Sequence, residues 1–342
     1  MPPPPGALHG QSVGFGRNGQ AWSTTATATQ VLLRTSQGWQ TVTLPVAPAT
    51  GDSIAVNGDT IVAVGLKDES MVVQTSADLG ATWSTQTVAS NEPTTEAAVA
   101  LSTTTGRFVA APRHVGSIGA VHGSTTVYVG GCGAAGRQIT LPGEAAFTGW
   151  AGDVLLSPAG SGIGGPTLFR SDDAGATWTD LTKAITGAAW PDDPATGPYF
   201  GPVLSLADGT AVVLEETLTE GVGISAKVLR FTADGAYTQI ASLTVPGNVG
   251  GPMDLLVSTY GTDAIAVAHL DGQAFDVVNV DGTVTTIAAA GLPAAPEALS
   301  FQDETNGLAQ VTVSGCTGDK TGCTSVTTIH VTTDGGHTWS AV

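Results

Sequence analysis

Three short segments of this chain repeat one another without a gap. Each begins with Ser or Thr, has Asp at its third position and Gly at its fifth, and ends in Thr-Trp. Side-chain oxygens of Ser, Thr and Asp bond to backbone groups inside tight turns, and Gly supports the positive φ that such turns need. Each copy follows a β-branched run, so the pattern predicts a structural turn between two strands. The repeated residues are Ser76, Asp78, Gly80, Thr82 and Trp83; Ser171, Asp173, Gly175, Thr177 and Trp178; and Thr332, Asp334, Gly336, Thr338 and Trp339.

The repeated pattern, S/T-x-D-x-G-x-T-W, resembles the Asp-box, also called the BNR repeat. Asp-boxes are found in sialidases, sortilin-type receptors, xyloglucanase-like glycosidases and photosystem II assembly factors. The resemblance implies that each copy joins the third and fourth strands of a β-propeller blade, with the Trp packed beneath the turn. It also implies that the Asp residues are structural, because the turn already uses their oxygens. Weaker copies occur at residues 35–39, 232–237 and 279–282.

The spacing of these turns sets the number of blades. They recur at intervals close to the ~40–50 residues of a four-stranded blade, except between Trp83 and Trp178, where one turn is missing. We therefore predict an all-β chain with one domain over residues 12–342, a seven-bladed β-propeller of four-stranded antiparallel blades. Six blades are the alternative. The predicted blades cover residues 12–44, 52–88, 96–141, 146–183, 200–243, 251–288 and 296–342, and residues 1–11 are predicted to be a Pro-rich linker stub.

Acidic residues dominate the charge of the chain. There are 29 Asp and Glu against 11 Lys and Arg, which gives a formal net charge of −18. Such a surface repels phosphate, so the charge argues against nucleic acid as a partner and against anionic membrane surfaces. No apolar run reaches the ~18–20 residues of a membrane span, so no direct membrane insertion is expected. We expect a monomer.

The N-terminal sequence has neither the basic start nor the apolar region of a signal peptide. Its four consecutive prolines resemble the end of a stiff linker left after a signal or anchor was removed. We therefore expect a secreted or cell-surface anchored protein.

Two of the three cysteines suit a disulfide. Cys316 and Cys323 bracket the short polar segment TGDKTG between two strand-like runs. This spacing is typical of a disulfide that closes a hairpin loop, and it favours an oxidising compartment. Cys132 is left over and is expected to be a buried thiol. No close pair of Cys and His residues indicates a metal site, so neither a metal nor another cofactor is expected.

The resemblance places the binding face opposite the Asp-box turns, on the loops between second and third strands and on the links between blades. The richest link covers residues 184–202 and contains exposed aromatic candidates beside carboxylates. Aromatic rings stack on sugar rings and carboxylates accept hydrogen bonds from sugar hydroxyls, which indicates a glycan site. Packing of the aromatic residues onto the blades is the alternative. The candidates are Trp190, Asp192, Asp193 and Tyr199.

Two further segments are predicted to be loops on this face. Residues 215–226 contain Glu215 and Glu216, which are either binding residues or part of a solvated charged loop. Residues 112–124 contain His114 and His122, which suit a metal pair or acid–base groups.

Whether the chain is an enzyme can be tested against the residues that the resembling enzymes need. A sialidase needs three arginines that grip the substrate carboxylate, a Tyr–Glu pair, an Asp acid/base and an Arg-Ile-Pro signature. This chain has no Arg-Ile-Pro, and only Arg113 falls in a predicted loop of the binding face. A glycoside hydrolase would need two carboxylates about 5–9.5 Å apart, and a polysaccharide lyase would need a His or Tyr base.

No catalytic residue is assigned on these grounds. The sequence favours a non-catalytic extracytoplasmic module that binds a glycan or a protein. A carbohydrate-active enzyme, a glycoside hydrolase or lyase that differs from a typical sialidase, is the alternative.

Overall fold

The computed structural model shows an all-β protein. In the part of the chain that it describes, 29 strands and one short helix form antiparallel sheets. The helix, α1 (Thr182–Thr186), has five residues. Within the described residues, no helix has the length and apolarity needed to cross a membrane. The structure describes residues 21–23, 29–35, 38–49, 53–68, 70–88, 94, 96–115, 121–132, 134–145, 148–160, 167–187, 198–219, 223–246, 255–316 and 323–341.

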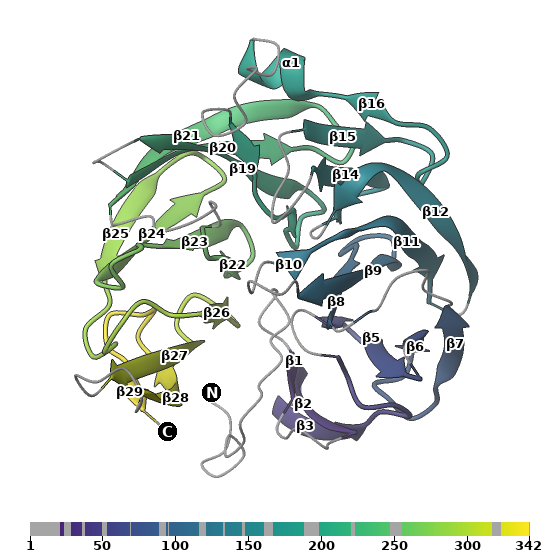
Figure 1. Ribbon diagram of the computed structural model, residues 1–342, viewed down its shortest axis with the longest axis horizontal. Coiled ribbons are helices and arrows are strands. Elements are labelled where there is room, and N and C mark those ends of the chain that lie inside the picture. The colour runs from purple at the N-terminus through teal and green to yellow at the C-terminus, as the bar shows by residue number, and fades with distance from the viewer. Residues whose placement is uncertain are drawn as a thin grey trace.

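The sheets are arranged around a common axis, like the blades of a propeller (Figure 1). In each four-stranded sheet the chain passes from the inner strand to the outer strand in sequence order, and every strand is antiparallel to its neighbour. Inner strands of different sheets contact one another near the axis, as β4 does with β8 and β22 with β26. The prediction of an all-β propeller with four-stranded antiparallel blades is therefore confirmed.

The strands are as follows. The first sheet contains β1 (Ala21–Ser23), β2 (Gln30–Thr35) and β3 (Gly38–Thr43). The next three contain β4 (Ile54–Asn57), β5 (Thr60–Lys67), β6 (Ser70–Ser76) and β7 (Ser84–Val88); β8 (Glu96–Leu101), β9 (Arg107–Val115), β10 (Val121–His122), β11 (Ser124–Gly131) and β12 (Ala134–Ala145); and β13 (Gly149–Ala151), β14 (Val154–Ala159), β15 (Thr167–Ser171) and β16 (Thr179–Asp180). The last three contain β17 (Tyr199–Phe200), β18 (Leu204–Ser205), β19 (Ala211–Thr219), β20 (Gly223–Phe231) and β21 (Tyr237–Pro246); β22 (Val257–Tyr260), β23 (Ala264–Ala268), β24 (Ala274–Asn279) and β25 (Val284–Ala288); and β26 (Ala298–Phe301), β27 (Gly307–Cys316), β28 (Cys323–Thr332) and β29 (Ser340–Ala341).

The number of blades differs from the main prediction. Six of the sheets have four or five strands, whereas the sheet over residues 21–43 has three in the described part of the chain. The part of the chain that the structure describes therefore contains six complete blades, the number that the sequence analysis kept as the alternative. The repeat spacing marks turns between outer strands, so it cannot tell a complete sheet from one that lacks an inner strand. Residues 1–11, the predicted linker stub, lie outside the described residues.

The core lies between neighbouring blades and consists mainly of Val, Ala and Leu side chains. Val212 and Leu214 of β19, for example, pack against Val257 and Val267 of the following blade, and all four are almost completely buried. Val and Ile suit strands because their branched side chains fit a pleated surface. Two faces of each blade are buried in this way, which explains the long apolar runs in the inner strands.

The two ends of the propeller are different. In a four-stranded antiparallel blade, the turns between strands one and two and between strands three and four lie at the same end. We call this end the turn face and the opposite end the loop face. On the turn face, Asn57 Nδ2 donates to the carbonyl of Thr103 (2.7 Å) and Ser102 Oγ donates to that of Gly152 (3.0 Å). Thr103 Oγ1 donates to the carbonyl of Leu206 (2.6 Å), which joins two blades that are not adjacent. Hydrogen bonds between turns therefore hold this end of the ring together.

Candidate functional site

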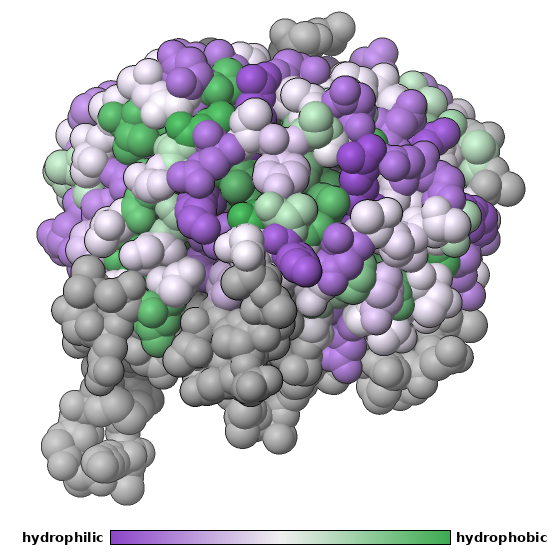
Figure 2. Space-filling view, turned by 90° about the horizontal axis from the view of Figure 1, so that it is seen from above, coloured by the Kyte–Doolittle hydropathy of each residue, from purple (hydrophilic) through white to green (hydrophobic). Residues whose placement is uncertain are grey.

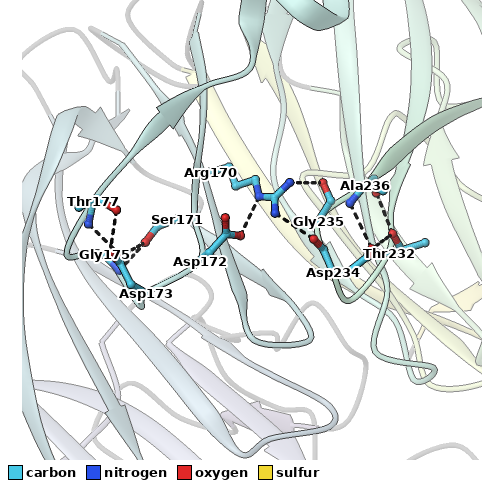
Figure 3. Close-up of polar contacts among 10 residues, drawn as sticks. All are labelled: Arg170, Ser171, Asp172, Asp173, Gly175, Thr177, Thr232, Asp234, Gly235 and Ala236. Atoms are coloured by element: carbon cyan, nitrogen blue, oxygen red, sulfur yellow. Dashed lines mark hydrogen bonds and ion pairs between the residues drawn. The ribbon is translucent and has the colours of Figure 1, made fainter.

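The three repeated segments form turns with the same set of hydrogen bonds. In the second copy, Ser171 Oγ donates to Asp173 Oδ1 (2.8 Å) and accepts from the N–H of Gly175 (2.7 Å), as Figure 3 shows. Asp173 Oδ1 accepts from the N–H of Thr177 (2.8 Å), and Asp173 Oδ2 accepts from Thr177 Oγ1 (2.7 Å). Both carboxylate oxygens are thus used inside the turn.

The first and third copies repeat these bonds. Asp78 binds the N–H and hydroxyl of Thr82 at 2.8 and 2.6 Å, and Asp334 binds those of Thr338 at 2.9 and 2.6 Å. The glycines of the three copies have φ values of 85°, 89° and 90°, which L residues rarely adopt. Each turn is therefore a self-contained structural unit.

The hydrogen bonds keep these carboxylates ionised. Bonds from the backbone and side chain of Thr177 lower the pKa of Asp173 to about 2, and those from Thr338 lower the pKa of Asp334 to about 2. A general acid needs the opposite shift, a pKa raised toward neutrality. The turn carboxylates are therefore unsuited to proton transfer.

These pKa values predict a loss of stability in acid. A carboxylate whose pKa is lower in the folded than in the unfolded chain, where it is about 3.9, stabilises the fold fully above that value. The contribution is lost as the pH falls through the folded-state pKa of about 2. We expect the urea midpoint to fall progressively between about pH 4 and pH 2, and the fall to be smaller in Asp173→Asn. Asp263→Asn, at an exposed carboxylate in the β22–β23 turn and outside the three repeated segments, is the control. Equal pH profiles for Asp173→Asn and the unmodified protein would contradict this assignment.

Arginine side chains connect neighbouring turns. Arg170 Nε donates to Asp172 Oδ1 (2.7 Å), and its terminal nitrogens donate to the carbonyls of Gly235 (3.0 Å) and Asp234 (2.9 Å) in the next blade (Figure 3). Arg137 donates to the carbonyl of Ala174 (3.0 Å) in the same way. These cations hold turns together, which accounts for their position away from the loop face.

The segment 215–226 is not a loop. It lies almost entirely in β19 and β20, and only residues 220–222 fall outside the described residues. The side chains of Glu215 and Glu216 are 4% and 0% exposed, so the alternative of a solvated charged loop is wrong. Strand β19 continues to Thr219 and β20 begins at Gly223, so the hairpin takes in most of the predicted loop, because each carboxylate finds a partner inside the protein.

The side chains of Glu215 and Glu216 have different partners, one within the hairpin and one toward the next blade. Glu215 forms an ion pair with Lys227 Nζ at 2.7 Å, directly across the hairpin. Glu216 Oε2 accepts from the N–H of Leu255 (3.3 Å), which leads into the next blade. Successive residues of a strand face opposite sides of its sheet. The two carboxylates therefore cannot act together on one substrate.

Of the four candidate residues in the link 184–202, the structure describes only Tyr199. Tyr199 lies in β17, half-buried and directly opposite Glu216. Trp190, Asp192 and Asp193 lie outside the described residues, so their role in binding stays a prediction.

The segment 112–124 is also mainly strand. The backbone of His114 in β9 pairs with that of His122 in β10, and the side chains of both lie outside the described residues. Arg113 is a strand residue with a buried side chain, not a loop residue. Only residues 116–120 of this segment are not described. The Gly-rich composition of this segment did not indicate that β9 continues through it, because the extension depends on pairing with β8 and β10.

The sequence analysis missed one polar cluster near the loop face. His269 Nε2 lies 3.2 Å from Asp276 Oδ2, and Thr286 Oγ1 donates to Asp276 Oδ1 (2.6 Å). The His and Asp side chains are 11% and 8% exposed. Asp276 and Thr286 are cross-strand partners, so only the register of β24 and β25 brings them together. Within the described residues, no group of three or more His, Cys, Asp or Glu residues is placed to hold a metal ion.

A cavity lies beside the inner strands. Its volume is about 60 Å³, and its walls include Ile54, Val99, Leu101, Leu204 and Thr259. A water molecule takes about 30 Å³, whereas ligand pockets usually measure about 300–1,000 Å³. The cavity is therefore too small for a sugar ring.

Comparison with known proteins identifies chains of similar fold but no protein family. No model of a protein family matches the chain, and no curated protein sequence matches it. Among solved structures, 284 chains match. They include YCF48 from Cyanidioschyzon merolae (16% identity, TM-score 0.47, 84% of this chain and 83% of that chain) and an inactive virginiamycin B lyase from Staphylococcus aureus, solved with quinupristin (14%, 0.48, 86% and 89%). A prolyl endopeptidase chain has 12% identity and a TM-score of 0.50, over 97% of this chain and 49% of that chain. At these identities the likeness extends only to the fold.

The outer surface has a mixed character. Figure 2 shows hydrophobic residues in small groups among hydrophilic ones on the coloured part of the rim. Outer strands such as β7 and β25 present exposed Ser, Thr and Gln side chains. Among the described residues, the exposed large hydrophobic side chains are Leu218, Val284, Val313 and Val326.

Proposed function

We propose that this protein is a non-catalytic extracytoplasmic binding module of the Asp-box type, which takes a glycan or a protein on its loop face. The Asp-box assignment is supported by the identical hydrogen bonds of three turns, with Asp78, Asp173 and Asp334 in the same role. Side chains of the turn face are committed to bonds within and between the turns, so we place binding on the loop face. Loops supported by a rigid scaffold are where binding residues usually lie.

The observation that carries the proposal is the divergence of Glu215 and Glu216. A glycoside hydrolase needs two carboxylates that face one substrate. Here one carboxylate is paired with Lys227 and the other binds the N–H of Leu255 in the next blade. The carboxylates of the three turns are also committed to hydrogen bonds. This arrangement argues against the enzyme alternative and favours binding without turnover.

Tyr199 packs against the core cluster that includes β19 and is only partly buried, and we propose that its accessible part is the aromatic surface of the site. Trp190, Asp192 and Asp193 complete the proposed glycan contacts from the same link. With a ring on one side of a bound sugar, the carboxylates would accept hydrogen bonds from its hydroxyls. The net charge of −18 favours neutral glycans and basic protein segments over anionic ligands.

Arrays of oligosaccharides and of peptides, with hydrolysis and lyase assays on the glycans, test the proposal. We expect binding without product, and at least a roughly tenfold rise in Kd, about 1.4 kcal/mol, for Tyr199→Ala. Tyr199→Phe keeps the ring and should retain most of the affinity. Asp234→Asn, on the turn face, should bind like the unmodified protein. Product release that Glu215→Gln or His114→Ala abolishes would overturn the proposal in favour of an enzyme, and unchanged binding in Tyr199→Ala would remove this residue from the site.

A further inference from the structure

The third strand of the last blade, β28, is much longer than the outer strand beside it. Its ladder with β27 has ten residue pairs and no register shift, whereas its ladder with β29 has only two pairs. Within the described residues, the outer edge of β28 over residues 323–329 therefore has no strand beside it. The side chains of Cys316 and Cys323, at the end of this hairpin, lie outside the described residues, so their disulfide stays a prediction.

The hydrogen bonds of the sheet determine which backbone groups of β28 point outward. The N–H of Gln302 donates to the carbonyl of Asn306 (2.9 Å), so Asn306 and every second residue after it point toward β26. The residues between them point toward β28, where Val311 is the partner of Thr328. The N–H and C=O of Thr327, and of every second residue on either side of it, therefore face the open edge of β28.

Another blade also has a short outer strand, but there a helix covers the edge. Strand β16 pairs with only two residues of β15. Beyond it, Thr182 Oγ1 of α1 accepts from the N–H of Leu168 (3.1 Å), and the N–H of Leu181 donates to the carbonyl of Leu168 (2.9 Å). Among the described residues, no group bonds to the outward backbone of Thr327 or Ile329 in this way.

The open edge also lacks the features that usually prevent strand addition. Natural edges are short, charged, bulged or interrupted by proline. The outer strands β3, β7 and β25 have six residues or fewer, and the longer β12 and β21 contain Pro142 and Pro246 and have register shifts in their ladders. Residues 323–332 contain no Pro, Lys, Arg, Asp or Glu. Their Thr, Val and Ile residues favour an extended strand that another strand can join.

Apolar side chains beside this edge are exposed to solvent. Val326 and Val313 lie opposite each other in the β27–β28 ladder and are 60% and 45% exposed. They are on the same face of the hairpin as Ala309, which belongs to the core shared with the preceding blade. A strand added to β28 would place every second side chain next to Val326 and would extend this apolar row.

We propose that the open edge of β28 binds an extended, uncharged segment of a partner protein, which joins the last blade as a further outer strand. Unpaired N–H and C=O groups at strand spacing are satisfied by another extended backbone. A charged segment would lose hydration at this edge without gaining an ion pair, because β27 and β28 have no acidic, Lys or Arg side chain. A second copy of the chain would bring its own charge of −18, which opposes self-association. The site is separate from the proposed contacts around Tyr199 and does not rest on them.

Hydrogen exchange of the backbone amides tests whether the edge is open in the full chain. We expect the N–H of Thr327 to exchange at least about tenfold faster than that of Thr328, because only Thr328 points toward β27. Equal protection of the two amides would overturn the proposal. Sedimentation would then show which rival occupant covers the edge, since a dimer indicates a second copy and a monomer indicates another segment of the same chain.

Fluorescence anisotropy with short labelled peptides tests the binding itself. The peptides alternate Thr with Val, Ile or Tyr and end in a soluble Gly-Ser tail. We expect saturable binding of at least one of them to the full chain. N-methylation of the alternate residues that face β28 should raise its Kd at least about tenfold, because it removes N–H donors and blocks close approach. N-methylation of the other residues should leave the affinity nearly unchanged.

One pair of protein variants locates the binding edge. Thr327→Pro removes an outward N–H from β28, where proline is tolerated because the ladder with β27 does not use it, and should also raise the Kd at least about tenfold. Val284→Pro removes an outward N–H from β25 and should bind like the unmodified protein. The proposal is wrong if none of the peptides binds, if both N-methylated forms bind equally well, or if the two variants have the same affinity. The methylated peptides leave the protein unchanged, so their result does not depend on how well Thr327→Pro folds.

Discussion

Replacing Gly336 with alanine is expected to lower the free energy of unfolding by about 2–4 kcal/mol. Gly336 has a φ of 90°, where an L residue is strained. A Cβ atom at this position would lie 2.0 Å from Cζ of Phe275, whose ring is buried in the preceding blade. The ring cannot yield without moving other buried aromatic residues. Urea unfolding followed by tryptophan fluorescence measures the loss.

Gly58→Ala is the matched control. Gly58 also has a positive φ, of 56°, but a Cβ there meets no atom within 4 Å. The free energy of unfolding of this variant should fall only by the cost of the strained backbone conformation, about 1–2 kcal/mol. Equal losses in the two variants would mean that backbone strain alone explains the glycine, and that the contact between blades contributes nothing.

The same contact recurs at the other turns. A Cβ on Gly80 would lie 2.2 Å from Cγ1 of Val42, and one on Gly175 would lie 2.2 Å from Cδ1 of Ile139. Val42 and Ile139 belong to outer strands of the preceding sheets. The glycine of the repeat therefore has two roles, a turn conformation and a close approach between blades. Sequence reasoning supplied the first role and had no access to the second.

Local features of the chain were predictable. The three turns, the strands on either side of them and most blade boundaries follow from residue types at fixed spacings. What the sequence could not provide was register. The burial of Glu215 depends on Lys227 lying across the hairpin, twelve positions later. The link between Asp276 and Thr286 depends on the pairing of β24 with β25. A polar segment between two strands can be a loop or a continued hairpin, and composition alone does not distinguish them.

The same limit applies to the blade count. The turn at residues 35–39 is a weak repeat, and it correctly marks a hairpin between β2 and β3. Its presence does not require a complete four-stranded sheet around it. Repeats identify the outer part of a blade, where the turn is, and leave the inner strand to be inferred from apolar residues that occur throughout the chain.

The second large effect is expected for Trp339→Ala, with a loss of about 3–5 kcal/mol in the free energy of unfolding. Trp339 is 5% exposed, and its indole N–H donates to the carbonyl of Gly336 (2.8 Å). Its ring meets that of Phe301 edge-on, with centroids 5.9 Å apart and an interplanar angle of 69°. Alanine would leave a cavity among buried aromatic residues that cannot close it.

Trp83 occupies the same position of the first repeat, and this makes Trp83→Ala the matched control. Its side chain is only half-buried, and its indole nitrogen has no hydrogen-bond partner in the described part of the chain. The preceding sheet meets this turn with Val42 rather than with an aromatic residue. We therefore expect Trp83→Ala to lower the free energy of unfolding by less than half as much as Trp339→Ala does in the same urea experiment. Equal losses would show that the turn motif itself, and not the neighbouring blade, determines what its tryptophan contributes.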